Sequence, residues 1–136
     1  MKLFPEHFLF QIADFSISTV VTPGRKYPPA NFGTLMYQPP EIVRLQHFYP
    51  MRVDIWTAGV IIYVLVHGDY PFRILKRSKM LSAMKRKSFP KKGLSPELVE
   101  LLEKLLENDP AARPEVLPTI GDKWLVPFLT ANSARH

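Results

Sequence analysis

Apolar residues run almost without interruption along one central segment of the chain. From Ile55 to Gly68 there is no charged side chain, and apolar positions cover nearly every side of a helix. We predict a helix over residues 52–67, ended by Gly68 in the usual C-terminal position and blocked from continuing by Pro71. A helix that is apolar all round is either a membrane span or the axis of a packed core. The run is short for a span, so we predict a buried core helix and no membrane.

Shorter helices are predicted on both sides of this segment. Pro39 and Pro40 can open a short helix that reaches Leu45, because proline is tolerated in a first helical turn. Residues 74–87 have the pattern of a basic amphipathic helix. Its apolar contacts are Ile74, Leu75, Leu81 and Met84.

The clearest amphipathic helix is predicted to begin at Ser95. Serine is a good N-cap, and Pro96 suits the first helical position. We expect Asp109 and Pro110 to end this helix, and residues 115–129 to form one or two short helices. The apolar face of the first helix is Leu98, Leu101, Leu102, Leu105 and Leu106, and the final helices are anchored by Trp124, Leu125, Phe128 and Leu129.

The remaining segments lack helical periodicity. Residues 1–20 are predicted to be extended, with an apolar run of strand length over residues 8–13. Residues 21–32 contain several prolines and a glycine, which predicts a loop. The fold class that follows is mainly α with little or no sheet: a central buried helix ringed by amphipathic ones. Residues 130–136 form a tail.

Composition narrows the class of protein. Apolar residues make up 46% of the 136-residue chain, which is typical of a globular domain. The chain has no cysteine, which excludes a disulfide scaffold and a thiolate zinc site and fits a reducing, intracellular compartment. The formal charge of +6 is uneven: from Arg73 to Lys92 there are nine lysines or arginines and no acid, whereas residues 97–115 are acidic overall. Such asymmetry concerns partners rather than fold.

Four motifs stand in an informative order. They are Asp14-Phe15-Ser16, then Gly33-Thr34-Leu35-Met36-Tyr37-Gln38-Pro39-Pro40-Glu41, then Asp54-Ile55-Trp56-Thr57-Ala58-Gly59, then Asp109-Pro110-Ala111-Ala112-Arg113-Pro114. In content and order they resemble the C-terminal lobe of a eukaryotic Ser/Thr protein kinase domain. The Pro-Pro-Glu variant and Gly68-Asp69-Tyr70-Pro71-Phe72 are similar to the calmodulin-kinase-like or Pim-type branch. The resemblance covers residues 1–129, about half of a normal kinase domain.

The resemblance implies a role for several residues. Asp14 would hold the magnesium ion that bridges the ATP phosphates, and Thr34 would lie on the substrate side. Glu41 and Arg113 would form a buried ion pair that ties the activation segment to the helical lobe. Asp54 would cap backbone N–H groups of the catalytic loop. The alternative for Asp14 is a loop aspartate that binds no ligand.

The chain departs from the family at the positions that carry the catalytic residues. Laid on the catalytic loop, Lys2 takes the place of the catalytic base, Phe4 that of a phosphate-contacting lysine and His7 that of the second magnesium ligand. A lysine ammonium cannot accept the hydroxyl proton of a substrate, and phenylalanine cannot neutralise phosphate. Ser16 replaces the glycine of the magnesium motif. Alternatively, residues 1–10 are unrelated to the family; in either case no catalytic residue is intact.

The basic run from Arg73 to Lys92 has two interpretations: a solvated helix face, or a docking surface for an acidic protein partner. We do not expect nucleic acid there, because Phe89 is the one aromatic ring among the charges. The histidines show no metal-ligand spacing. Thr19, Thr22 and Tyr27 lie in the expected activation loop and are open to phosphorylation.

Three functional hypotheses follow. In the first, the chain is part of a kinase domain whose parent transfers the ATP γ-phosphate to protein Ser or Thr, although the chain alone is inactive and does not bind ATP and magnesium. In the second, it is a pseudokinase-type binding or regulatory module that docks a protein partner through the activation segment and the basic helix. In the third, it is a non-functional gene product. We expect an intracellular location, cytoplasmic or nuclear, and exposed apolar surface along residues 55–66.

Overall fold

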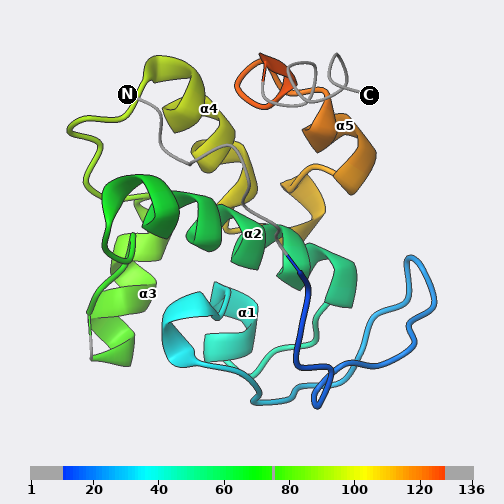
Figure 1. Ribbon diagram of the computed structural model, residues 1–136. Helices are drawn as coiled ribbons and strands as arrows, with labels where there is room; N and C mark the ends of the chain where they lie inside the picture. The colour runs from blue at the N-terminus through cyan, green and yellow to red at the C-terminus, as the bar shows by residue number, and fades with distance from the viewer. Residues whose placement is uncertain (1–10, 75, 128–136) are drawn as a thin grey trace.

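The fold is a set of helices arranged around one central helix. The computed structural model describes residues 11–74 and 76–127. Figure 1 shows α2, Pro50–His67, crossing the middle of the molecule, with α1 and α3 on one side of it and α4 and α5 on the other. The flanking elements are η1 Leu35–Tyr37, α1 Pro40–Val43, α3 Arg77–Lys85, α4 Pro96–Leu105, η2 Pro110–Ala112 and α5 Val116–Ile120.

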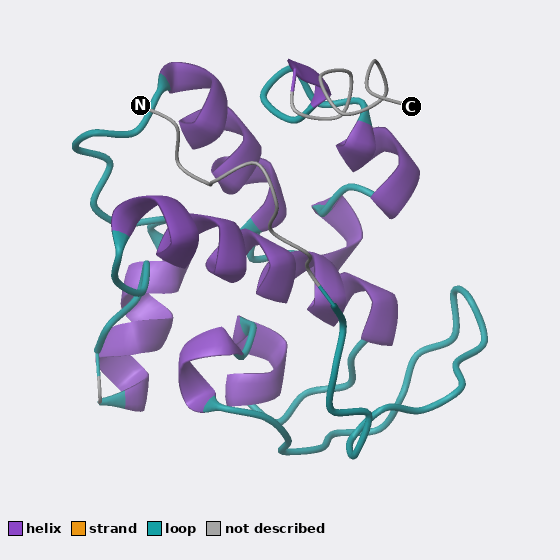
Figure 2. Cartoon of the chain, in the orientation of Figure 1, coloured by secondary structure: helices purple, strands orange, loops and turns teal. Residues whose placement is uncertain are grey.

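The expectation of a mainly helical chain with little or no sheet is confirmed for the described part of the chain (Figure 2). The nearest approach to a strand pair there is an isolated antiparallel bridge between Tyr27 and Phe48. Its two backbone hydrogen bonds measure 2.8 and 3.1 Å and connect the loop over residues 21–32 to the segment before α2. The predicted loop is therefore a loop, and beside this bridge its side chains Tyr27, Ala30 and Phe32 pack against the small cluster of Ile42, Phe48 and Val53.

The central helix forms where the apolar run predicts it. It begins at Pro50, and Gly68 ends it with a left-handed φ of +83° while its N–H donates to the Val64 carbonyl. Trp56, Val60 and Tyr63 are fully buried in the main core.

Gly59 allows α2 and α4 to approach closely. A Cβ atom at this position would lie 2.9 Å from the Cβ of Leu105 and 3.1 Å from a methyl group of Leu106. Helix α4 begins as predicted, because the Ser95 Oγ accepts a hydrogen bond of 3.2 Å from the Leu98 N–H. The apolar face of α4 then packs onto α2 at the glycine.

Helix α3 is shorter than the predicted helix over residues 74–87. Its N-cap residue is Lys76, whose side chain accepts no hydrogen bond from the N–H groups of the first turn. No capping interaction therefore stabilises an earlier start of the helix. At the other end Lys87 adopts a left-handed φ of 48°, and the Ser88 N–H turns back to the Ala83 carbonyl. Leu75 lies outside the described residues.

The chain ends depart further from expectation. Within the predicted strand over residues 8–13, Gln11, Ile12 and Ala13 form no strand and are exposed, because no neighbouring strand pairs with them in the described part of the chain. Residues 8–10, Phe128, Leu129 and the tail 130–136 lie outside that part.

One side of α2 is uncovered, as expected, although less of it than expected. Met51, Ile61 and Leu65 are each about half exposed, at 46%, 45% and 46%, whereas Ile55 and Val60 are buried. Helix α2 is also long and apolar enough to span a membrane by length and composition, a test that the core helix of a soluble protein passes equally well. Its contacts with the surrounding helices make it the axis of the core.

Candidate functional site

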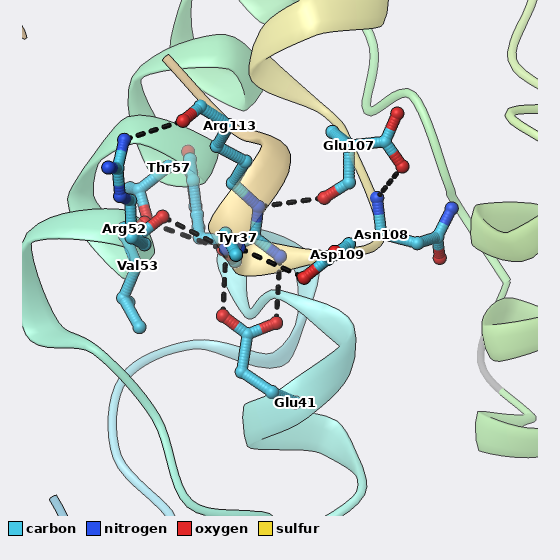
Figure 3. A network of polar contacts seen from close by, with 10 residues as sticks. Tyr37, Glu41, Arg52, Val53, Thr57, Glu107, Asn108, Asp109 and Arg113 are labelled. Atoms are coloured by element: carbon cyan, nitrogen blue, oxygen red, sulfur yellow. Dashed lines mark hydrogen bonds and ion pairs between the residues drawn. The ribbon is translucent and has the colours of Figure 1, made fainter. Parts of the chain in front are cut away.

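A buried ion pair stands at the centre of the site (Figure 3). The Arg113 guanidinium donates to both oxygens of the Glu41 carboxylate, at 2.7 and 2.8 Å. Glu41 is 3% exposed and Arg113 is 1% exposed. A charge removed from water in this way requires a partner, and the two-pronged geometry of arginine matches a carboxylate. The structure thus brings together the two residues that the sequence analysis paired.

The other donors of Arg113 are also used. Its Nε donates to the Glu107 carbonyl at 2.7 Å, and one terminal nitrogen also donates to the Arg52 carbonyl at 2.9 Å. The guanidinium carbon lies 5.1 Å from the centre of the Trp56 ring, where a cation is attracted to the π face. Arg113 therefore joins α1, α2 and the end of α4 at a single point.

Arg52 makes the reciprocal contact. It donates to the Arg113 carbonyl at 2.5 Å and to the Glu115 carboxylate at 3.2 Å. The start of α2 is thereby bound to the segment between η2 and α5. Nothing in the sequence pattern singled out Arg52, because half of the partners in this network are backbone carbonyls.

The segment over residues 31–38 is shaped by the Gln38 amide. This buried nitrogen donates to the Asn31 side chain at 3.2 Å, the Phe32 carbonyl at 2.8 Å and the Gly33 carbonyl at 3.1 Å. Gly33 itself has a φ of +73°, which a residue with a side chain rarely adopts. Sequence reasoning missed Gln38, since a glutamine between a tyrosine and two prolines gives no signal of its own.

Tyr37 connects this segment to α2. Its carbonyl accepts a hydrogen bond of 3.4 Å from the Thr57 hydroxyl, and its ring meets the Tyr70 ring edge-on with centroids 5.4 Å apart. The two tyrosine hydroxyls are 3.4 Å apart, and the hydrogen bond between them raises the pKa of Tyr37. Residues 31–43 are thus held along the length of the segment.

Thr34 lies at the surface of this segment. It precedes η1, and its carbonyl accepts from the Tyr37 N–H at 2.9 Å, but its side chain makes no cap hydrogen bond. Thr34 as a whole is exposed.

Asp14 lies apart from the ion pair, in the exposed segment over residues 11–20. Hydrogen bonds from the side chain and backbone of Ser16 lower the pKa of its carboxyl, so it is ionised near neutral pH. Asp14 has the left-handed φ of 62°, whereas Ser16 does not, so serine is accommodated there without backbone strain. The loss of the family's glycine therefore has no conformational cost in this structure.

Asp54 is exposed on α2, and desolvation by the surrounding protein raises the pKa of its carboxyl. No donor within the described residues bonds to it. Its expected partners are backbone groups of the catalytic loop, which lie outside the described residues together with Lys2, Phe4 and His7.

A site for ATP and magnesium needs more groups than the described residues provide. Magnesium is held in proteins by one or two carboxylates together with the phosphates of the nucleotide, which themselves need a cradle of donors. The described residues offer Asp14 alone at the family position, and they contain no group of three His, Cys, Asp or Glu side chains placed to hold a metal ion.

The fold and the buried ion pair define a class of protein, and comparison with known proteins identifies the family. The family model described as "Protein kinase domain" matches residues 3–125. The chain belongs to the protein kinase family, and the resemblance seen in its motifs is confirmed.

The chain is similar to Ser/Thr kinases of the calmodulin-kinase-like branch. It is 31% identical to sperm motility kinase 2B of Mus musculus over 124 residues, which cover 90% of this chain and 25% of that protein. It is 32% identical to SNF-related serine/threonine-protein kinase of Homo sapiens over 123 residues, covering 90% and 16%, and 31% identical to calcium-dependent protein kinase 22 of Oryza sativa subsp. japonica over 137 residues, covering 89% and 23%. The chain thus spans a quarter or less of the length of these relatives.

Proposed function

We propose that residues 1–129 are the substrate-side part of a Ser/Thr protein kinase domain, and that the parent domain transfers the γ-phosphate of ATP to protein Ser or Thr. In this proposal residues 31–43 form the platform on which a substrate segment lies, and Thr34 contacts it. The observation that carries the proposal is the buried Glu41–Arg113 pair, which fixes one end of this platform to α2 and α4. The Gln38 amide fixes the other end.

The chain on its own is proposed to be inactive. Transfer of a phosphoryl group depends on positioning ATP and on neutralising the charge that develops on its phosphates. If residues 1–7 are laid on the catalytic loop, Lys2 stands at the base and cannot accept the substrate proton, and Phe4 stands at the phosphate contact and cannot neutralise charge. If they are unrelated to the family, the loop is absent from this chain. The family placement also favours an intracellular location, cytoplasmic or nuclear.

The experiment combines an activity assay with a map of substrate contact. The 136-residue chain is incubated with Mg²⁺-ATP and a library of Ser- and Thr-centred peptides that carry a photoreactive group. Phosphorylated peptides are sought by mass spectrometry, and crosslinks are located after irradiation. We expect no phosphorylation above the background without protein, and crosslinks within residues 31–43.

Two glutamine variants sharpen the map. Gln38→Leu removes three hydrogen bonds from the platform, whereas Gln46→Leu changes an exposed glutamine outside it. We expect crosslinking within residues 31–43 to fall in the first variant and to persist in the second. Phosphoryl transfer by the chain alone would overturn the proposed inactivity, and crosslinks unchanged by Gln38→Leu would overturn the platform.

A second function is favoured by the basic helix. In it the chain is a binding or regulatory module that docks a protein partner through the activation segment and α3. The cations of α3 are exposed and form no ion pair in the described part of the chain. Cations that do form ion pairs lie on either side of the helix: Arg73, Lys87 and Lys91.

A further inference from the structure

One surface of the molecule carries positive charge that no carboxylate in the described part of the chain neutralises. We call it the α3 basic surface: Lys76, Arg77, Lys79, Lys85 and Arg86, all exposed, on and beside α3. The opposite side of the helix is fixed, because Met80 and Met84 are fully buried in the main core. Helix α3, which carries most of these cations, lies at one edge of the molecule (Figure 1).

Three neighbouring cations have carboxylate partners, whereas those of the α3 basic surface have none among the described residues. Arg73 pairs with Asp69 at 3.1 Å, Lys87 with Glu107 and Lys91 with Glu103, both at 2.5 Å. Among the described residues, no carboxylate lies within ion-pair distance of the five cations, and Arg86 donates to the Ser82 hydroxyl instead. Among the described residues, some cations of this region form ion pairs within the fold, whereas the five cations of the α3 basic surface remain free to bind another molecule.

Helix formation does not account for these charges. The positive end of a helix dipole lies at its first turn, where acids are favourable and cations are not. Helix α3 has no acid in its first turn and no side-chain cap, and it begins with Lys76, Arg77 and Lys79. The helix dipole therefore gives no electrostatic support to cations at these positions.

We propose that the α3 basic surface docks a segment of a protein partner that is rich in glutamate or aspartate. The helix has nine residues and is about 13 Å long, which corresponds to about four residues of an extended peptide. Cations on both flanks of the serine-lined outer face, Ser78 and Ser82, can meet carboxylates along such a peptide, and the hydroxyls can donate to it.

Two other classes of partner fit the surface less well. Single-stranded nucleic acid is bound by cations together with aromatic rings, but Phe89 is only 6% exposed and packs edge-on against Tyr63 and Phe72. A membrane-surface helix needs large apolar side chains beside its cations. No exposed large apolar side chain lies within the described residues of the stretch 73–92. The surface offers charge and hydroxyl groups only.

This inference deepens the binding role proposed above and does not depend on phosphoryl transfer. The probe is a fluorescein-labelled peptide of alternating Glu and Ser, titrated with the 136-residue chain and followed by fluorescence anisotropy. The test variant is Arg77→Gln/Lys79→Gln/Lys85→Gln. The matched control, Lys92→Gln/Lys104→Gln/Lys123→Gln, removes the same charge from exposed positions outside both the α3 basic surface and the activation segment.

We expect the test variant to weaken binding about tenfold and the control less than about twofold, because each exposed pair contributes a modest amount. Arg77→Lys/Lys79→Arg/Lys85→Arg is expected to retain binding, which separates loss of charge from damage to the helix. Equal weakening in test and control variants would overturn the proposal, since net charge alone would then explain binding. Tighter binding of a labelled single-stranded oligonucleotide or of phosphatidylserine vesicles would overturn the class of partner. If the test variant loses peptide binding but still crosslinks substrate peptides within residues 31–43, the substrate platform does not depend on the α3 basic surface.

Discussion

At the scale of single residues, Arg113 is the position where we expect substitution to lower the free energy of unfolding strongly. Removing one member of a buried ion pair leaves the other charged and unsolvated, and it typically costs about 3–5 kcal/mol. We expect Arg113→Met to lower the free energy of unfolding by about that amount, measured by urea denaturation followed by circular dichroism. Arg113→Lys should also be destabilising, because an ammonium cannot donate to both Glu41 oxygens in the arginine geometry.

The double variant Glu41→Leu/Arg113→Met tests the cause. It removes both charges, so it should be more stable than Arg113→Met alone. Arg44→Met, which removes an exposed arginine, serves as the control and should change stability by about 0.5 kcal/mol or less. If Arg113→Met lowered the free energy of unfolding no more than Arg44→Met does, the ion pair would make no measurable contribution to stability.

Tyr63 gives the chain a dependence on alkaline pH. Burial, with a smaller effect from Asp69, raises the pKa of its hydroxyl from 10.0 to about 12, and the hydroxyl donates to the Pro90 carbonyl at 2.8 Å. The folded state therefore holds the proton more tightly than the unfolded state. The stabilisation is complete below pH 10 and is lost as the pH rises towards 12.

The measurement is the unfolding midpoint in urea between pH 8 and pH 11, a range chosen to bracket the onset of this loss. We expect Tyr63→Phe to show a shallower decline above about pH 10 than the parent chain. Tyr49→Phe, which removes a hydroxyl outside the main core, is the control. Parallel declines in all three proteins would rule out Tyr63 as the titrating group.

At the scale of elements, the contact between α2 and α4 depends on Gly59. Alanine is a better helix former than glycine by about 1 kcal/mol, but here its Cβ would meet the Cβ of Leu105 at 2.9 Å. We expect Gly59→Ala to destabilise the protein by about 1–3 kcal/mol, as overpacking of a core does. The measurement is thermal unfolding by circular dichroism.

Gly121→Ala is the matched control for this steric argument. Its Cβ would approach nothing closer than the Pro118 carbonyl oxygen at 3.6 Å, and the φ of −79° is compatible with alanine. We expect no loss of stability in this variant. A stabilised Gly59→Ala protein would show that the two helices can move apart without cost.

The elements also show what sequence could predict. The presence of α2 and α4 was predictable from their apolar patterns together with Gly68 at the end of one and Ser95 at the start of the other, although α2 begins at Pro50, earlier than predicted, and α4 ends at Leu105 rather than at Asp109. The ends of α3 were not predictable, because Lys87 leaves the helix through a left-handed conformation that no lysine signals. The same holds for the site: Glu41 and Arg113 could be paired by resemblance, whereas the roles of Arg52 and Gln38 depend on backbone carbonyls brought close only by the fold.

At the scale of the whole molecule, the uncovered side of α2 should govern behaviour in solution. Met51, Ile61 and Leu65 are about half exposed on a helix whose other sides form the core. Exposed apolar side chains on one helix favour association. We expect the purified chain to self-associate as its concentration rises, measured by sedimentation velocity, and Ile61→Gln/Leu65→Gln to associate less with little change in unfolding free energy.

Val116→Gln/Leu117→Gln is the control for this prediction. It removes two exposed apolar side chains from α5, at 50% and 80% exposure, and leaves α2 unchanged. This variant should associate as the parent chain does. A parent chain that stays monomeric at high concentration and melts cooperatively at high temperature would show that the exposed side of α2 has no such effect.

The Glu41–Arg113 pair also has a consequence for the order of folding during synthesis. Its two residues are separated by 72 positions. Closing so long a loop costs chain entropy that only later contacts can offset. When the chain is made from its N-terminus, residues 31–43 leave the ribosome well before Arg113 exists. Until then Glu41 stays hydrated and its segment unfixed, so residues 31–43 are held in place only after the C-terminal helices have been made.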